Sequence, residues 1–174
     1  KKTKQIVTIF AALALAVTAG LSFAGTKTKA AESDEFTRTA IEIAADMGYG
    51  WNLGNTMEAT NTWTSNPKVT DFETAWGQPV TTKAMIDGIK KAGFNSIRIP
   101  VSWSNMMSSD GNYTIDASYF KRIDEIISYA FANDMYVIIN DHYDGGWWEH
   151  FCGNKRDCMK HYKNLWTQVA GHYK

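Results

Sequence analysis

Apolar residues after position 48 follow a pattern that repeats three times: a short apolar run, a polar segment, and a longer segment with apolar residues at helical spacing. The short runs predict strands, at 49–53, 95–101 and 135–140. The longer segments predict helices, at 82–91, 117–133 and 155–174. Strands that alternate with helices predict a parallel sheet, because each connection must cross back over the sheet.

Each expected helix has an apolar face and a terminal signal. A short amphipathic helix precedes the repeats and ends at Gly48, with one face made of Ile41, Ala44, Ala45 and Met47. Gly93 follows the helix at 82–91, whose apolar stripe is Ala84, Met85, Ile89 and Ala92. Asp116 is the expected N-cap of the helix at 117–133, whose stripe is Phe120, Ile123, Ile126, Ile127 and Ala130.

The connections differ in length on the two sides of the sheet. Those from helix to strand are short, whereas those from strand to helix are long and aromatic, as in a barrel whose active site is built by the loops after the strands. A doubly wound open sheet is the main alternative, although no glycine-rich phosphate loop follows the first strand. We therefore predict an α/β fold, a (β/α)₈ TIM barrel. Such a barrel takes about 250 residues, so about the first three β/α units would be present in a truncated chain.

The N-terminal residues have the order of a secretory signal. Lys1, Lys2 and Lys4 precede an apolar run at 6–17, which is followed by small residues. We expect a signal peptide at 1–30, a polar lead-in at 31–40 and the barrel part at 41–174, in a secreted protein. Residues 5–26 carry no charge and are long enough to span a bilayer, so a retained anchor at the cell surface is the alternative.

Composition narrows the class of ligand. The chain has 18 basic and 18 acidic residues and no net charge, so we expect no nucleic-acid partner. Seven Trp, eight Tyr and eight Phe occur, many beside Gly, Asn and Asp, which favours a sugar ligand over pure core packing. Cys152 and Cys158 form a candidate local disulfide. The flanking His150 and His161 do not complete a common zinc spacing, and we expect no metal site.

Two polar residues fall at equivalent ends of neighbouring strands. Arg98 lies between Ile97 and Ile99, so the two isoleucines face the helices and Arg98 faces the barrel mouth. A guanidinium held there should need a carboxylate partner, although a structural ion pair or a solvent-facing arginine would fit the same pattern. His142 shares a strand face with Asn140, which places it at the level of Arg98. Two such residues together favour a functional site.

Four segments in order resemble family 5 glycoside hydrolases, closest to their bacterial endo-β-1,4-glucanase and xyloglucanase branch. They are GWNLGNT at 50–56, ETAWGQP at 73–79, TKAMIDGIKKAGFNSIRIPVSW at 82–103 and YVIINDHYDGGWW at 136–148. The resemblance extends from about residue 41 to the end. It implies a retaining endo-β-1,4-glucanase without metal or organic cofactor, monomeric when complete, that acts on cellulose, xyloglucan or mixed-linkage glucan.

The resemblance also implies roles for individual residues. Arg98 resembles the arginine that hydrogen-bonds the catalytic nucleophile and keeps it ionised, and His142 resembles a histidine that lines the subsite before the scissile bond. Asn52 and Asn55 resemble positions near the non-reducing-side subsites. Tyr143 stands where relatives often have a second His or Trp, so sugar contact is expected. The candidate stacking platforms are Trp63, Trp76, Trp147 and Trp148.

The catalytic carboxylates of the family have no match in this chain. The acid/base is the Glu of an Asn-Glu-Pro motif, which the sequence lacks, and the nucleophile is a Glu at a later strand. A pair built from Asp141, Asp144 and Glu149 is a weak alternative. We therefore expect the chain alone to be inactive. The remaining alternatives are a non-catalytic carbohydrate-binding domain, for which three strand–helix repeats are unusual, and a membrane-anchored surface domain.

Overall fold

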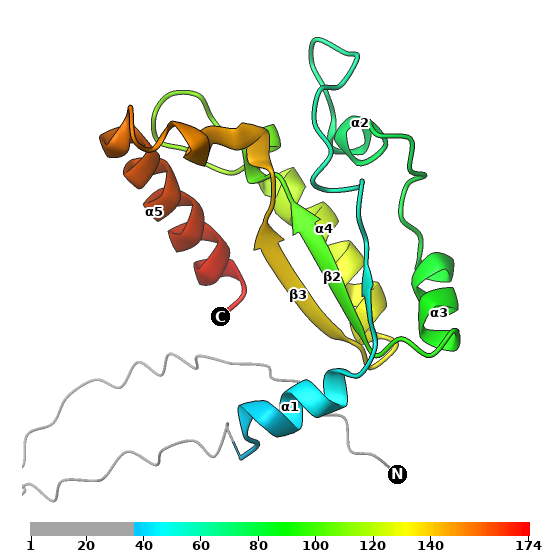
Figure 1. The fold of residues 1–174 in the computed structure, drawn as a ribbon. Helices are drawn as coiled ribbons and strands as arrows, with labels where there is room; N and C mark the ends of the chain where they lie inside the picture. Colours follow the sequence, from blue (N-terminus) through cyan, green and yellow to red (C-terminus); the bar gives the residue numbers. More distant parts are fainter. Residues whose placement is uncertain (1–36) are drawn as a thin grey trace, which may run out of the picture. The chain divides into compact units, whose positions relative to one another are not determined.

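The computed structural model describes residues 37–174, of which residues 38–174 form one compact unit. The expected strands and helices occur in the expected order (Figure 1). The strands are β1 (Gly50–Asn52), β2 (Ser96–Val101) and β3 (Tyr136–Asp141). The helices are α1 (Ala40–Met47), α2 (Val69–Glu73), α3 (Lys83–Lys91), α4 (Ala117–Phe131) and α5 (Lys155–His172), with 3₁₀ helices η1 (Trp103–Met106) and η2 (Asp144–His150).

The strands of the described part form one parallel sheet in the order β1–β2–β3. Asn52 is the register partner of Arg98. Pairing continues past the strand ends, because the Leu53 N–H donates to the Arg98 carbonyl and the His142 N–H donates to the Val101 carbonyl, both at 2.9 Å. The carboxyl ends of the three strands therefore meet at one edge. The parallel α/β arrangement predicted from the sequence is confirmed.

Helix α4 lies behind β2 and β3 and covers one face of the sheet (Figure 1). Ile97 and Ile99 of β2 are fully buried against this layer, whereas Arg98 between them is half-buried on the other face, as the alternation predicts. The Asp116 side chain caps α4 by accepting from the Ser118 N–H. Burying one isoleucine stabilises a fold by about 1.5–3 kcal/mol, and Ile97 and Ile99 both belong to the hydrophobic core of the described part.

The buried face predicted for α3 is wrong. Ile86 is the buried residue of this helix, whereas Ala84 and Ala92 are exposed and Met85 and Ile89 are only half-buried. The physical reason is that α3 packs one side against α4, while its other side borders an open groove beside β1. The glycine expected after the helix is confirmed, because Gly93 has a φ of +98° and donates to the Lys90 carbonyl.

The long loop between β1 and α3 has a buried segment near its start. Residues 56–60 are all buried, and the Glu58 carboxylate accepts from the N–H groups of Asn55 at 2.6 Å and Thr56 at 2.9 Å. Later in the same loop, Glu73 of α2 is fully buried and forms a two-point ion pair with Arg122 of α4. Glu58 thus fixes the start of the loop through the loop's own backbone, whereas Glu73 ties its later part to α4. The course of the loop is therefore fixed by buried charge as well as by apolar packing.

Helix α1 is anchored at the opposite end of the sheet from the candidate site. Asn95, which precedes β2, donates its amide to the Asp46 carbonyl at 2.7 Å, and the Asp46 carboxylate pairs with Arg38 at 2.8 Å. Gly48 ends the helix with a φ of +52°, as expected from the sequence. None of its residues is buried in the described part, and Ile41 is among the most exposed apolar side chains.

The predicted signal peptide at 1–30 and most of the lead-in at 31–40 lie outside the described residues. Within residues 37–174, no helix is both long and apolar enough to cross a membrane.

Candidate active site

Three side chains, those of Asn52, Arg98 and His142, meet near the carboxyl edge of the sheet and are called the Arg98 group. Asn52 ends β1, Arg98 lies within β2, and His142 follows β3. The Arg98 Nη1 donates to the Asn52 Oδ1 at 2.6 Å, and the Arg98 Nη2 lies 3.2 Å from the His142 Nδ1. Gly54 permits this arrangement, because a Cβ there would stand 2.7 Å from the Asn52 Nδ2. The structure thus brings together the two residues expected at the mouth and adds Asn52 to them.

The contact between Arg98 and His142 selects one tautomer of the neutral imidazole. A guanidinium can only donate, so the Nδ1 of His142 accepts and its ring proton is on Nε2. The His142 side chain is exposed, and its Nε2–H is therefore available to donate to a substrate oxygen. The expectation of a carboxylate partner for Arg98 is not met in residues 37–174, because an amide oxygen and an imidazole occupy the positions facing it and partial exposure solvates the charge.

The loop after β3 has an unusual backbone. Tyr143 and Asp144 have φ values of +59° and +48°, and Gly145 and Gly146 follow at +66° and +70°. A left-handed conformation costs energy for residues other than glycine and persists only where surrounding contacts impose it. Here the contacts come from the Asp144 side chain, which is 2% exposed. The strained turn redirects the chain directly after His142 and places Tyr143 near the carboxyl edge of the sheet, beside Trp76.

Asp144 is the anchor of that turn. Its carboxylate accepts from the Ser104 N–H at 2.6 Å, from the Ser104 hydroxyl at 2.9 Å and from the Trp147 indole at 2.7 Å. The neighbouring His161 is buried between the rings of Tyr113 and Trp147, and burial lowers its pKa, partly offset by Asp144. This network was not predicted, since sequence reasoning treated Asp144 only as a loop acid. The following Gly-Gly pair was the available signal for a tight turn.

The acids beside His142 are arranged as supports rather than as a catalytic pair. Burial and the neighbouring Asp144 raise the pKa of Asp141 to about 8, and the Asp141 Oδ1 is buried without a hydrogen-bond partner among the described residues. A retaining pair stands about 5–5.5 Å apart on either side of the scissile bond. Asp144 is also fully engaged in holding the turn. The alternative catalytic pair that would use Asp144 is therefore not supported.

The candidate aromatic platforms differ in their exposure. Trp76 and Tyr143 stand together with ring centroids 6.0 Å apart, and both are at least 40% exposed. Trp147 is half-buried and stacks on His161 at 4.2 Å, so packing occupies one of its faces, whereas Trp148 is more exposed. Trp63 is 98% exposed. Asn55 contributes its backbone N–H to Glu58 and, among the contacts of the described residues, none to the Arg98 group.

The predicted disulfide is not formed. Cys152 and Cys158 are both free thiols. Cys152 is exposed on the turn after η2, whereas Cys158 is buried in the first turn of α5. The Cys158 Sγ donates to the Trp147 carbonyl at 3.5 Å, which directs it inward. The two thiols therefore occupy different environments, and spacing in the sequence did not reveal this difference.

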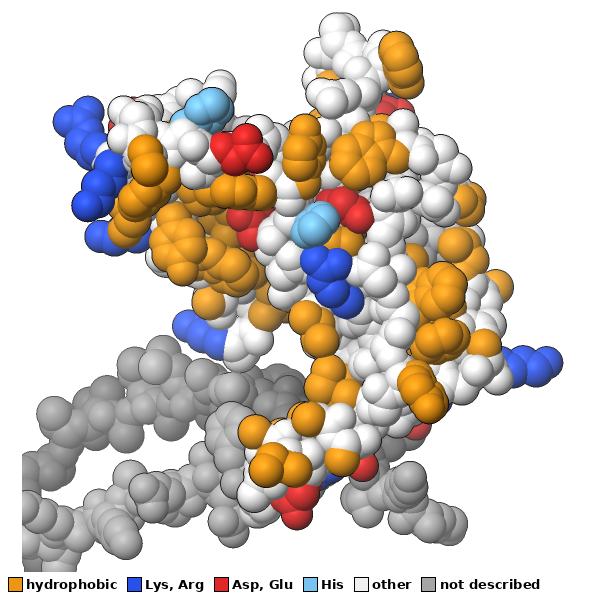
Figure 2. Space-filling view, in the orientation of Figure 1, with side chains coloured by type: hydrophobic (Ala, Val, Ile, Leu, Met, Phe, Trp, Pro, Cys, Tyr) orange, Lys and Arg blue, Asp and Glu red, His pale blue; other side chains and the backbone are white. Residues whose placement is uncertain are grey.

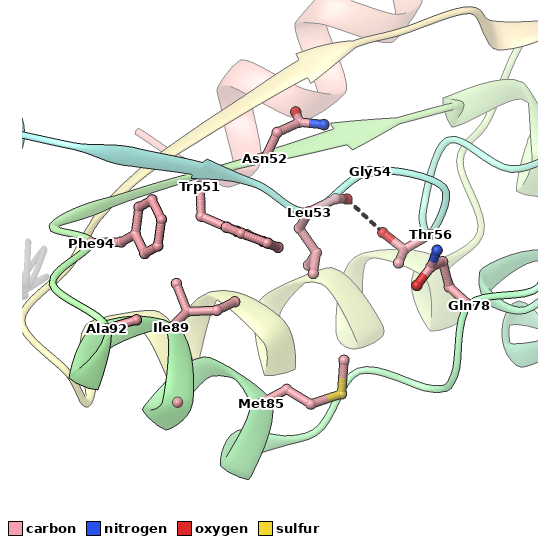
Figure 3. Close-up of a pocket in the computed structure, with 11 residues that line it drawn as sticks. Trp51, Asn52, Leu53, Gly54, Thr56, Gln78, Met85, Ile89, Ala92 and Phe94 are labelled. Atoms are coloured by element: carbon pink, nitrogen blue, oxygen red, sulfur yellow. Dashed lines mark hydrogen bonds between the residues drawn. The ribbon is translucent and has the colours of Figure 1, made fainter.

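A separate apolar groove of about 470 Å³ lies on the other face of β1 (Figure 3). Trp51 and Phe94 form one wall and Met85 and Ile89 of α3 form the other, while the Asn52 side chain points away from it. Its lining is mostly apolar and offers few hydrogen-bonding groups, unlike the Arg98 group. The groove marks a face of β1 and α3 that is uncovered in the described part.

Comparison with known proteins agrees with this geometry. The family model for cellulase (glycosyl hydrolase family 5) matches residues 57–174. Endoglucanase A of Paenibacillus barcinonensis is 43% identical over 166 residues, which cover 92% of this chain but 40% of that protein. A broad-specificity endoglucanase of Ruminococcus champanellensis with bound cellotriose superposes with a TM-score of 0.72 at 42% identity, covering 78% of this chain and 40% of that one.

A family 5 lichenase mutant from Caldicellulosiruptor sp. F32 in complex with cellotetraose gives a TM-score of 0.71 at 43% identity, covering 79% of this chain and 37% of that one. The chain thus spans about 40% or less of the length of each of these relatives.

Proposed function

The chain belongs to glycosyl hydrolase family 5, the cellulase family, and from this premise we propose that the complete protein is a retaining endo-β-1,4-glucanase. Residues 41–174 would form the first three β/α units of its (β/α)₈ barrel. Two features support this assignment. The structural neighbours share the sheet and its connections, and the apolar groove between β1 and α3 offers a surface for further barrel units to cover.

The observation that carries the proposal is the meeting of Asn52, Arg98 and His142, from three adjacent strands, near the carboxyl edge of the sheet. In a parallel barrel, active sites lie at this edge. Arg98 uses one N–H toward each neighbour and retains donors that can bind a carboxylate bidentately. We assign it the role of holding the nucleophile ionised, and we assign His142 the donation of its Nε2–H to the sugar before the scissile bond.

The chemistry proposed is retaining hydrolysis by two carboxyl groups. One protonates the leaving glycosidic oxygen while the other attacks the anomeric carbon, and water then releases the glycosyl-enzyme intermediate. The Glu pair would come from barrel units beyond these residues, because Asp144 is engaged with Ser104 and Trp147. The proposal involves no metal and no organic cofactor.

We propose a β-glucan substrate: cellulose, xyloglucan or mixed-linkage glucan. The cellotriose and cellotetraose bound by the two structural relatives support a β-glucan. Tyr143 and Trp148, with Trp147 at its free face, would contact sugar rings, and Asn55 would lie near the non-reducing-side subsites. We further propose a monomeric, secreted enzyme with a signal peptide at 1–30 and a lead-in at 31–40. The order of charged, apolar and small residues supports this.

The test is hydrolysis by the complete polypeptide expressed from its whole reading frame. Carboxymethyl cellulose, mixed-linkage glucan and xyloglucan should lose viscosity early, before much reducing sugar appears. Proton NMR of the first products should show the β-anomer. Absence of hydrolysis on all three polymers, or an initial α-anomer, would overturn the proposal.

A further inference from the structure

One aromatic side chain is presented to solvent without any packing role. Trp63, on the loop between β1 and α2, is 98% exposed. An indole that contacts nothing loses the stabilisation that burial would provide, and large aromatic side chains exposed in this way are typical of binding surfaces. The other exposed tryptophans keep partial packing, with exposures of 43% for Trp51, 40% for Trp76 and 38% for Trp148.

Trp63 forms one wall of a small polar groove of about 290 Å³. The other walls carry hydroxyl and carboxylate groups, from Thr62, Thr64, Asp71 and Thr74, with Ala75 completing the lining. Backbone groups hold two of them in place, since Thr64 accepts from the Asn66 N–H at 3.4 Å and Asp71 accepts from the Lys68 N–H at 2.7 Å. An aromatic face beside ordered hydroxyl and carboxylate groups matches a sugar ring, which has apolar C–H faces and hydroxyl edges.

The groove beside Trp63 is linked to the Arg98 group by the contact between Trp76 and Tyr143. The Trp76 indole donates to the Thr60 carbonyl at 3.1 Å, which fixes the base of the loop that carries Trp63. The same Trp76 ring stands 6.0 Å from the Tyr143 ring, and Tyr143 directly follows His142. Figure 2 shows hydrophobic side chains on this face both over the loop beside α2 and over the loop that follows β3. A linear chain could therefore lie along this face from Trp63 to His142.

We propose that Trp63 and its groove form a distal subsite for the β-glucan chain, which stacks one sugar ring on the indole and favours long chains over short ones. The proposal rests on the assigned endoglucanase function and adds a specificity-determining residue to it. Covering one indole face removes on the order of 100 Å² of apolar surface from water. After the cost of ordering the loop and the sugar, we expect about a tenfold effect on long substrates.

The experiment uses the complete enzyme with Trp63→Ala, the conservative Trp63→Phe, and the control Phe131→Ala. Phe131 is an exposed aromatic residue, 62% accessible, at the end of α4. Values of kcat and KM are measured on mixed-linkage glucan and on an aryl cellotrioside. In Trp63→Ala, the ratio of kcat/KM on the polymer to kcat/KM on the trioside should fall about tenfold through KM. Trp63→Phe should restore most of it, and Phe131→Ala should leave it unchanged.

The outcomes separate this inference from the function on which it rests. No hydrolysis by the unaltered enzyme defeats the endoglucanase assignment itself. Hydrolysis with an unchanged ratio in Trp63→Ala defeats only the distal subsite. An equal loss on both substrates also defeats it, because a general disturbance of the loop would act on both. Thermal unfolding within about a degree of the unaltered enzyme identifies variants that retain the fold.

Discussion

The ion pair between Glu73 and Arg122 provides a direct test of how the loop over the candidate site is held. Arg122 donates to both Glu73 carboxylate oxygens, at 2.8 and 2.9 Å, and to the Thr81 carbonyl at 2.7 Å. The Glu73 side chain is 0% exposed and that of Arg122 is 12% exposed. Methionine at position 122 would keep the length of the side chain but remove these three bonds, together with the bond that Arg122 donates to the Glu125 carboxylate. Glu73 would then retain only the bond from the Thr81 N–H.

Leaving one charge of a buried pair without its partner costs about 3–5 kcal/mol, and the slight exposure of Arg122 favours the lower end. We therefore expect Arg122→Met to lower the free energy of unfolding by about 3 kcal/mol, which corresponds to a fall in Tm of roughly 6–12 °C for a domain of about 150–250 residues. Adding Glu73→Gln should recover part of that loss, because a neutral amide needs no counter-charge. The single Glu73→Gln variant completes a double-mutant cycle that isolates the pair.

The measurement is thermal and urea unfolding of the complete enzyme, with Lys83→Met as the matched control. Lys83 pairs with Asp87 on the surface of α3, with side chains 54% and 43% exposed, and its loss should cost less than about 0.5 kcal/mol. Because the Glu73 loop carries Trp76, kcat/KM on polymer should fall severalfold in Arg122→Met. If Arg122→Met costs no more than Lys83→Met, the buried pair is not what fixes this loop.

Three further outcomes are expected. The 174-residue chain alone should release no reducing sugar from β-glucan above background, and turnover that follows the purified chain would show that a catalytic pair lies within it. In the complete enzyme, Arg98→Lys should lower kcat/KM by about 100-fold, because an ammonium cannot bind Asn52, His142 and a carboxylate together as the planar guanidinium does. A loss under threefold would argue against the role given to Arg98. The raised pKa of Asp141, about 8, exceeds its unfolded value, so its contribution to stability is complete below about pH 4 and is lost as pH rises through 8. Asp141→Asn should remove that slope, so its advantage in free energy of unfolding over the unaltered enzyme should grow by about 2 kcal/mol from pH 5 to pH 9, after allowance for partial exposure. A difference that does not change with pH would show that Asp141 is ionised in the native state.

Asp144→Asn is the control for the pH experiment. Asp144 accepts three hydrogen bonds. In the asparagine variant, an NH₂ group replaces one of the accepting oxygens and would point at hydrogen-bond donors. This variant should lose stability at every pH, in contrast to Asp141→Asn. Equal behaviour of the two variants would show that the carboxyl groups have equivalent surroundings.

The strands and helices could be predicted because the spacing of apolar residues along the chain indicates which side of each element is buried. Ile97 and Ile99 alternate with Arg98, and the structure places them on opposite faces of β2. The meeting of Arg98 with His142 was predicted, but the level expected for them is wrong. Arg98 pairs in register with Ile138, and His142 follows the end of β3, so the long Arg98 side chain spans the difference. The register of α3 was missed because Ile86 is buried by its contact with α4, and such a contact leaves no mark in the sequence of α3 itself.

The polar supports of the site could not be predicted for a related reason. Asp144 reaches Ser104, which lies 40 positions earlier in the chain, and Glu73 reaches Arg122, 49 positions away. Spacing within a segment carries no information about such distant partners. The two cysteines show the opposite error, since Cys152 and Cys158 are close in sequence but differ in burial.

The division of the β1–α3 loop at Thr60 has a consequence for how new substrate ranges could arise. Residues 56–60 are buried, and the Trp76 indole donates to the Thr60 carbonyl. At 61–66 the side chains are mostly exposed, so substitutions and insertions there would change the shape of the groove beside Trp63 at little cost in folding. Mutational libraries or grafted loops confined to this tip would sample polysaccharide preference while Arg98 and its neighbours stay in place.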